Sequence, residues 1–183
     1  MEIQNTVIIE KAARIIMNSG LQKLTIPNLA DELNVKQRQL YTLLTKDDDI
    51  LLMLLLSFKT DINDFLTELI PNTETPETEL SILFKKLYFL FQQKPYYLHI
   101  IFDKNLKERD INIKKTILWI RNMAENYLTS VITKGKKENT FKIKESTKSL
   151  VGKMLSGFRL FMKDEQRINE MILEMKSLKT SKD

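Results

Sequence analysis

The chain has no cysteine and only one histidine among its 183 residues. Without cysteine there can be no disulfide, no zinc–thiolate site and no cysteine nucleophile. His99 has no second histidine to join it in a metal site, and the paired Glu-x-x-His motifs of carboxylate di-iron bundles are absent. A serine–histidine triad would have to use this same histidine. We therefore predict that the protein is not an enzyme and needs no metal or cofactor.

Glycine and proline are also scarce, with 4 residues of each. Few helix breakers, together with many leucines, isoleucines and lysines, favour an all-α fold. The longest apolar run, residues 50–56, is far shorter than the about 20 residues that cross a bilayer. The first residues lack the basic and apolar stretches of a signal peptide, so we expect a cytoplasmic protein with no membrane partner.

The net charge of +5 is unevenly distributed along the chain. Residues 104–153 carry 13 Lys or Arg against 5 Asp or Glu, whereas residues 1–46 carry only 6 against 4. A basic total is therefore weak evidence for nucleic-acid binding by the N-terminal part. The evidence has to come from the pattern of residues instead.

Residues 25–46 read as two short helices joined by a tight turn. Thr25 suits the N-cap of the first helix, since its hydroxyl can accept a backbone N–H of the first turn. Pro27 falls in that turn, where a missing N–H costs little. Asn34 tolerates the left-handed conformation that ends a helix. The pattern predicts a helix–turn–helix or, in the alternative, a plain helical hairpin with a solvated polar face.

The second of these helices is expected over residues 36–44, with Leu40 and Leu44 directed inward. Its open faces are basic and polar, and no acid lies between Leu33 and Asp47. Arginine can pair with guanine and glutamine with adenine in the major groove. The segment therefore predicts a helix that reads DNA with Lys36, Gln37, Arg38, Gln39 and Thr42.

The flanking sequence extends this pattern over residues 7 to 56. IIEKAARIIMNSG and LQKLTI precede the reading segment, and Leu-Tyr and an acidic helix start follow. The order Ile-x-x-Ala-Ala, then Gly, then Thr-Ile-x-x-Leu-Ala resembles the TetR family of one-component transcriptional regulators. The resemblance implies a ligand-responsive DNA-binding regulator, usually a repressor, that acts as a homodimer on a pseudo-palindromic operator in double-stranded DNA.

Phosphate contacts follow from the same resemblance, which assigns them to Thr25, Lys36, Tyr41 and Lys46. Four positions depart from the family pattern, and two of them are Lys36, where the family often has serine, and Leu44, where it usually has phenylalanine. Thr42 replaces the second aromatic residue, and Lys46 stands one residue before the usual lysine, where this chain has Asp47. Three successive acids, residues 47–49, would repel DNA. The alternative is a metabolite-binding or interaction protein with a degenerate helix–turn–helix that does not read DNA.

About nine helices are expected in total. They form a helix–turn–helix DNA-binding domain over residues 1–46 and a helical ligand-binding and dimerisation bundle over residues 47–183. Outside the reading segment, helices are predicted over residues 5–19, 45–70, 76 onward after the cap Thr75, 95–103, 110–133, 144–163 and 164–178. Gly135, within a basic loop at 134–137, is expected to cap the helix before it.

Aromatic side chains are concentrated on the helices expected after residue 47. Each taken alone reads as ordinary core, but together they suit a bundle cavity for an apolar small-molecule effector. The predicted lining is Phe65, Phe84, Tyr88, His99, Trp119, Asn122, Tyr127 and Phe158.

The last two predicted helices carry more apolar side chains than we expect a hairpin to bury within one chain. A two-fold partner could cover them and give a four-helix interface. The predicted dimer interface contains Leu150, Met154, Phe158, Phe161, Ile168, Met171, Ile172 and Met175.

Overall fold

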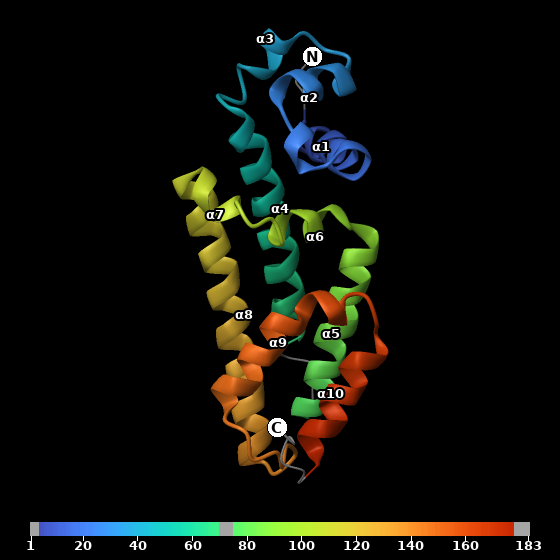
Figure 1. Ribbon diagram of the computed structural model, residues 1–183, viewed down its shortest axis with the longest axis vertical. Helices are drawn as coiled ribbons and strands as arrows, with labels where there is room; N and C mark the ends of the chain where they lie inside the picture. The colour runs from blue at the N-terminus through green and yellow to red at the C-terminus, as the bar shows by residue number, and fades with distance from the viewer. Residues whose placement is uncertain (1–3, 70–74, 178–183) are drawn as a thin grey trace. The chain divides into compact units, whose positions relative to one another are not determined.

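The computed structural model describes residues 4–69 and 75–177 (Figure 1). These residues form α-helices and one 3₁₀ helix and contain no strand, which confirms the predicted all-α fold. The expected helix end at residue 70 and the last expected helix residue, 178, lie outside the described residues. Within the described part of the chain, no helix is both long and apolar enough to cross a membrane.

Contacts divide the chain into two compact units, and each unit combines two stretches of sequence. The first contains residues 1–61 and 94–119, and the second contains residues 62–93 and 120–183. Both boundaries fall within long helices, α4 (Asp47–Leu69) and α8 (Ile111–Lys137). The functional division of the chain at residue 46 stays a prediction.

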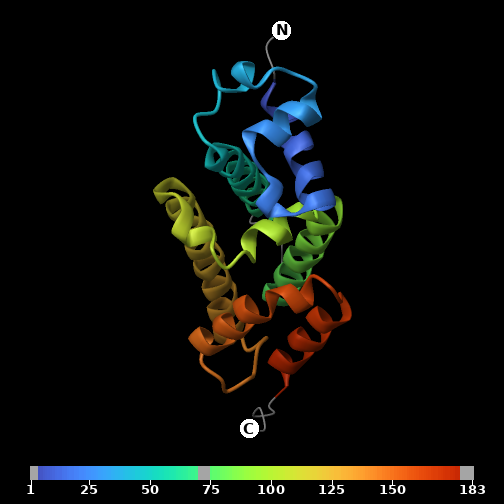
Figure 2. The same cartoon turned by 45° about the horizontal axis from the view of Figure 1, so that its top comes forward.

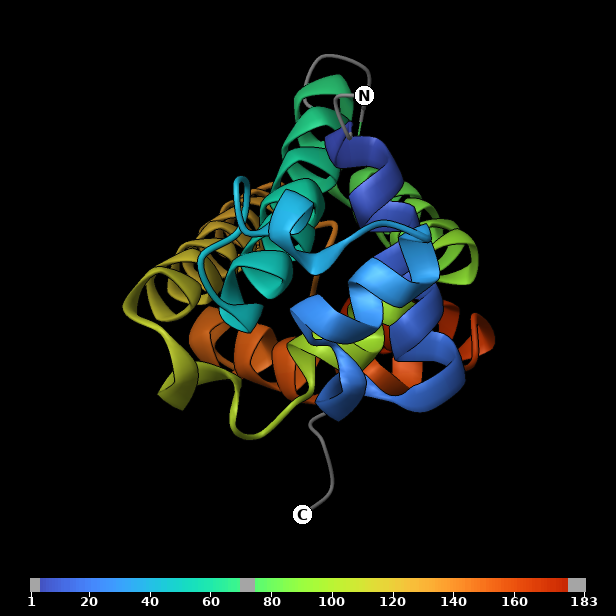
Figure 3. The same cartoon turned by 90° about the horizontal axis from the view of Figure 1, so that it is seen from above.

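The first unit begins with α1 (Asn5–Ser19), whose bounds match the prediction. Its apolar stripe is buried, with Ile8, Ala12, Ile15 and Ile16 in the core. Gly20 has a φ of 86°, a conformation that favours glycine, and it leads into the 3₁₀ helix η1 (Leu21–Lys23). α2 (Ile26–Leu33) packs beside α1 (Figure 3).

A short helix, α6 (Tyr96–Ile101), packs against α1 and holds the middle of α4. The buried hydroxyl of Tyr97 donates to the Asp61 carboxylate at 2.8 Å and lies 3.1 Å from the Ser57 hydroxyl. Lys94 also pairs with Asp61, at 2.5 Å. Burial raises the pKa of the Tyr97 phenol, so it stays protonated and able to donate.

The second unit is organised around α5 (Pro76–Gln93). The Thr75 hydroxyl accepts the Thr78 N–H at 3.2 Å, which confirms the predicted cap. The buried side of the helix includes Leu80, Leu83, Phe84, Leu87 and Phe91. α10 (Gln166–Lys176) packs against α5 and against α9 (Thr147–Phe161), with a sharp turn of the chain between α9 and α10 (Figure 2).

The end of α8 differs from the prediction. The helix continues through Gly135 to Lys137, and Asn139, with a φ of 58°, takes the left-handed conformation after it. Gly135 therefore lies inside the helix and does not cap it. The buried ring of Phe141 occupies the space next to Gly135, so a Cβ at this position would overlap the ring. The Phe141 N–H also donates to the Gly135 carbonyl at 3.0 Å.

The terminal hairpin buries most, but not all, of its apolar side chains within one chain, and the dimer interface stays a prediction. The predicted interface residues Leu150, Met154, Ile168, Ile172 and Met175 are buried, and Phe158, Phe161 and Met171 are half-buried. The physical reason is that α10 packs against α5 as well as α9. Leu160 and Leu173, which are 52% and 63% exposed, are the large apolar side chains that these two helices leave open.

Candidate nucleic-acid interface

The start of α2 is closed by two different side chains. The Thr25 hydroxyl accepts the Asn28 N–H at 3.3 Å, which confirms the predicted N-cap. The Ile26 N–H donates to Asp47 Oδ1 at 2.7 Å, so an acid from the start of α4 caps α2 as well. At the other end, Asn34 is left-handed with a φ of 54°, as predicted.

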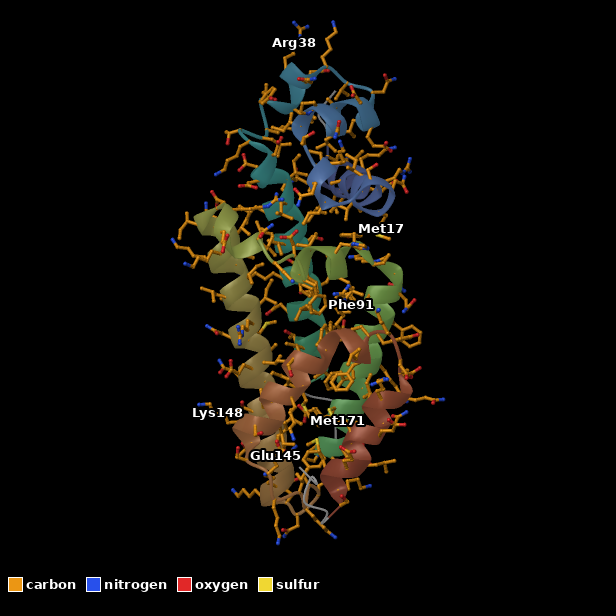
Figure 4. All side chains as sticks on the ribbon, in the orientation of Figure 1. Met17, Arg38, Phe91, Glu145, Lys148 and Met171 are labelled. Carbon is orange, nitrogen blue, oxygen red and sulfur yellow. The ribbon has the colours of Figure 1, made fainter. Side chains whose placement is uncertain are left out.

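The predicted reading helix, α3 (Gln37–Leu40), is anchored by one buried side chain and open elsewhere. Leu40 is fully buried, whereas Lys36, Gln37 and Arg38 are exposed. Within the described residues, the Arg38 guanidinium has no carboxylate partner. Figure 4 shows its side chain extending away from the ribbon at the end of the first unit. Arg38 is therefore free to meet a base edge or a phosphate.

Two of the predicted contact residues also stabilise α3 itself. The Gln39 side-chain oxygen accepts the Lys36 N–H at 3.0 Å, which closes the helix start. The Thr42 hydroxyl donates to the Gln39 carbonyl at 2.7 Å. Gln39 keeps its amide N–H groups as donors, and Tyr41 is 52% exposed beside it.

The reading helix is shorter than the predicted span of residues 36–44. After Leu40 the chain continues as a turn, with the Leu43 and Leu44 N–H groups both donating to the Leu40 carbonyl at 2.8 Å. Leu44 is buried, as predicted. The two inward leucines thus hold one helical turn and the bend that follows it.

Each of the three acids at the start of α4 has a structural partner inside the first unit. Asp47 caps α2, as described above. Asp48 pairs with Arg109, from the short helix α7 (Leu106–Arg109), at 3.4 Å. Asp49 Oδ2 accepts the Thr45 N–H and hydroxyl at 2.7 Å each, which caps α4 itself.

The pKa of the Asp49 carboxyl shows how its hydrogen-bond partners affect its ionisation. Burial raises its pKa, but the hydrogen bonds from the Thr45 hydroxyl and from the Thr45 and Lys46 backbone outweigh burial, and the net pKa is lowered. The Asp49 carboxyl therefore stays ionised, and its charge is used within the fold. The sequence indicated an acidic helix start at residues 47–49 but not the partners Ile26 and Arg109, which are far away in the chain.

Lys46 lies at the edge of a concave pocket of about 430 Å³ that is also lined by Thr25, Asp48 and Arg109. Its ammonium is hydrogen-bonded to the Asp110 carboxylate. This bond raises the pKa of Lys46 and lowers the pKa of Asp110. Neither Arg109 nor Asp110 was singled out from the sequence, since nothing local marks the junction of α7 and α8 as a neighbour of α4.

The residues predicted to line an effector pocket are divided between the units. His99 and Trp119 belong to the first unit, where both are exposed and Lys59 lies 4.1 Å from the Trp119 ring centroid. The second unit holds Phe65, Phe84, Tyr88, Asn122, Tyr127 and Phe158. Asn122 is exposed, whereas the other five are buried or half-buried.

In the second unit, the aromatic residues form edge-on pairs around α5. Phe84 meets Phe161 at a centroid distance of 5.7 Å, and Phe91 meets Phe158 at 5.6 Å. The Tyr127 hydroxyl donates to the buried carboxylate of Glu79 at 2.8 Å. The predicted pocket residues Phe84 and Phe158 thus lie in a shared aromatic core with Phe91 and with Phe161, which was predicted in the dimer interface. Glu79 was not singled out from the sequence.

Comparison with models of known protein families gave no match, and comparison with curated proteins also gave none. In the part of the chain that the structure describes, no three His, Cys, Asp or Glu side chains gather as a metal site would need. Similarity is found among solved structures.

The ketosteroid transcriptional regulator KstR2 of Mycobacterium tuberculosis has 14% identity and a TM-score of 0.82, over 97% of each chain. PfmR from Thermus thermophilus, a TetR family regulator, has 16% identity and a TM-score of 0.77, over 94% of this chain and 98% of that one. FadR from Bacillus subtilis, solved with stearoyl-CoA, has 17% identity and a TM-score of 0.70, over 96% and 100%. The chain therefore has the fold of the TetR-family transcriptional regulators.

Proposed function

We propose that the protein is a ligand-responsive transcriptional regulator of the TetR type that binds double-stranded DNA through α3. One observation carries the proposal: Lys36, Gln37 and Arg38 are presented on a helix that buried Leu40 anchors to the unit. An exposed guanidinium and amide at the start of such a helix suit base edges, and lysine suits phosphate. The likeness in fold to known regulators supports the same function.

The alternative of a degenerate, non-reading module had its best support in the acidic start of α4. That support is weakened because Asp47 caps α2, Asp48 pairs with Arg109 and Asp49 caps α4. These acids have folding roles and need not oppose DNA binding. The catalytic alternative gains no support from His99, which is exposed on α6.

Selection from sheared genomic DNA of the source organism tests DNA reading directly. We expect the protein to enrich a pseudo-palindromic site whose half-sites are about 34–36 Å apart, or a multiple of this, as two reading helices require. Stearoyl-CoA, the ligand named for the Bacillus subtilis structure, is the first effector probe and is expected to lower affinity for the enriched site. If no fragment is enriched even at low salt, the non-reading alternative replaces this proposal; if DNA binds but ignores stearoyl-CoA, the acyl-CoA effector class is wrong.

The regulator is proposed to act as a homodimer through the outward faces of α9 and α10. Leu173 and Leu160 leave apolar surface open there, and a pseudo-palindromic site requires two reading helices. We expect the wild type to sediment as a dimer at micromolar concentration and Leu173→Glu to sediment as a monomer, because a buried unpaired carboxylate is costly. Leu118→Glu, at an exposed leucine of the first unit, is the matched control and should stay dimeric. A monomeric wild type would rule out this assembly.

A further inference from the structure

Among the proposed phosphate contacts, Lys46 differs in that its charge is already neutralised by the protein. Its ammonium is bound by Asp110, whereas in the described part of the chain neither Lys36 nor Arg38 pairs with a carboxylate. We propose that Asp110 is a built-in competitor of DNA phosphate for Lys46 and thereby sets how tightly the first unit holds DNA. The inference rests on the proposed function, since it requires DNA as the rival anion.

Asp110 is held in place for this role by its second oxygen. While Oδ2 binds Lys46, Oδ1 accepts the Asn112 N–H at 2.7 Å and so caps the start of α8. The Asp110 side chain is only 13% exposed, whereas that of Lys46 is 52% exposed. The acid is thus fixed while the ammonium lies at the surface, where it can exchange one anion for another.

A second ion pair ties the same two segments together. Arg109, next to Asp110, pairs with Asp48 of the first turn of α4. Arg109 and Lys46 also line the same pocket as Thr25. Lys46 pairs with Asp110 and Asp48 pairs with Arg109, so both ion pairs join the start of α4 to the junction of α7 and α8. Each ion pair therefore keeps the two residues of the other pair close together. The competitor is therefore positioned by the fold and does not depend on a chance surface contact.

The Lys46–Asp110 ion pair is weak enough to moderate DNA binding without preventing it. An ion pair open to water contributes little, so phosphate can displace Asp110, but a fraction of the binding free energy is used in doing so. DNA presents about one negative charge per 1.7 Å of its axis, which makes it a strong rival for an exposed ammonium. Free Asp110 would then also lie near the DNA backbone and oppose it.

Asp110→Asn isolates the competition. Asparagine keeps an oxygen that can accept the Asn112 N–H, and it is itself a good N-cap, but its amide group cannot accept from an ammonium as strongly as an ionised carboxylate does. We expect affinity for both the enriched fragment and random DNA of equal length to rise about two- to fivefold. The slope of log K against log salt should steepen by up to about 0.9 per protomer, because Lys46 becomes available to phosphate.

Two controls separate this mechanism from a general change of charge. Asp31→Asn removes the same charge at an exposed site on α2 and should have a smaller effect than Asp110→Asn. In a Lys46→Met background, Asp110→Asn should lose its effect. If Asp110→Asn strengthens binding equally without Lys46, or if Asp31→Asn matches it, the competition is refuted while DNA binding itself stands. If neither the wild type nor any variant retains DNA, the proposed function fails, and the competition with it.

Discussion

Arg38→Ala is expected to weaken binding to the enriched DNA site by about 1–3 kcal/mol, which is roughly 5- to 150-fold, and to relax preference at one position of each half-site. The reason is geometric: Arg38 is exposed near the start of α3, and buried Leu40 fixes the orientation of that helix. Fluorescence anisotropy with the enriched site, its single-base variants and random DNA would measure both effects.

Lys36→Ala is the comparison for that experiment. Lys36 is exposed at the N-cap of α3 and is expected to contact phosphate, which carries no sequence information. Its removal should weaken all DNA about equally and flatten the salt slope by about one unit per site. The role given to Arg38 would be wrong if Arg38→Ala instead reduced specific and random binding by the same factor.

Phe141→Ala is expected to lower the free energy of unfolding by about 3–5 kcal/mol, because it empties a buried site against α8. Gly135→Ala should also destabilise the wild type, by about 1–3 kcal/mol, since the added methyl group overlaps the Phe141 ring. Urea unfolding followed by far-UV circular dichroism would measure each change.

The two substitutions should not be additive. Once Phe141 is alanine, Gly135→Ala has room and should become stabilising by up to about 1 kcal/mol, because alanine favours a helix more than glycine does. Gly152→Ala in α9, where nothing lies within 4 Å of an added Cβ, should stabilise the wild type by a similar amount. A destabilising Gly135→Ala in both backgrounds would show that the ring is not what requires glycine there.

Features with local causes were predictable from the sequence. The cap Thr25, the left-handed Asn34 and the bounds of α1 depend on side chains within a few residues of one another. The all-α fold and the buried stripe of α5 follow from helical spacing in the same way. Apolar periodicity and capping located the helix that presents Arg38, although this helix ends at Leu40 and not at the predicted residue 44.

Features with distant causes were not predictable in this way. Gly135 carries an ordinary helix-ending signal, and only the packing of Phe141 explains why the helix continues. The partners of Asp47 and Lys46 lie 21 and 64 residues away in the chain. Helical spacing also marks which side chains are apolar but not which face is covered: Trp119, whose place in a pocket stays a prediction, is 40% exposed.

The first unit consists of two stretches of sequence, and this limits how its N-terminal part, residues 1–46, could be exchanged between regulators. A graft of residues 1–46 alone would leave behind Asp47, which caps α2, and also α6, which packs on α1. It would also separate Lys46 from Asp110. A chimaera that keeps its DNA preference should therefore carry residues 94–119 and the start of α4 along with residues 1–46. In this fold the unit proposed to bind DNA consists of two separate stretches of sequence rather than one continuous segment.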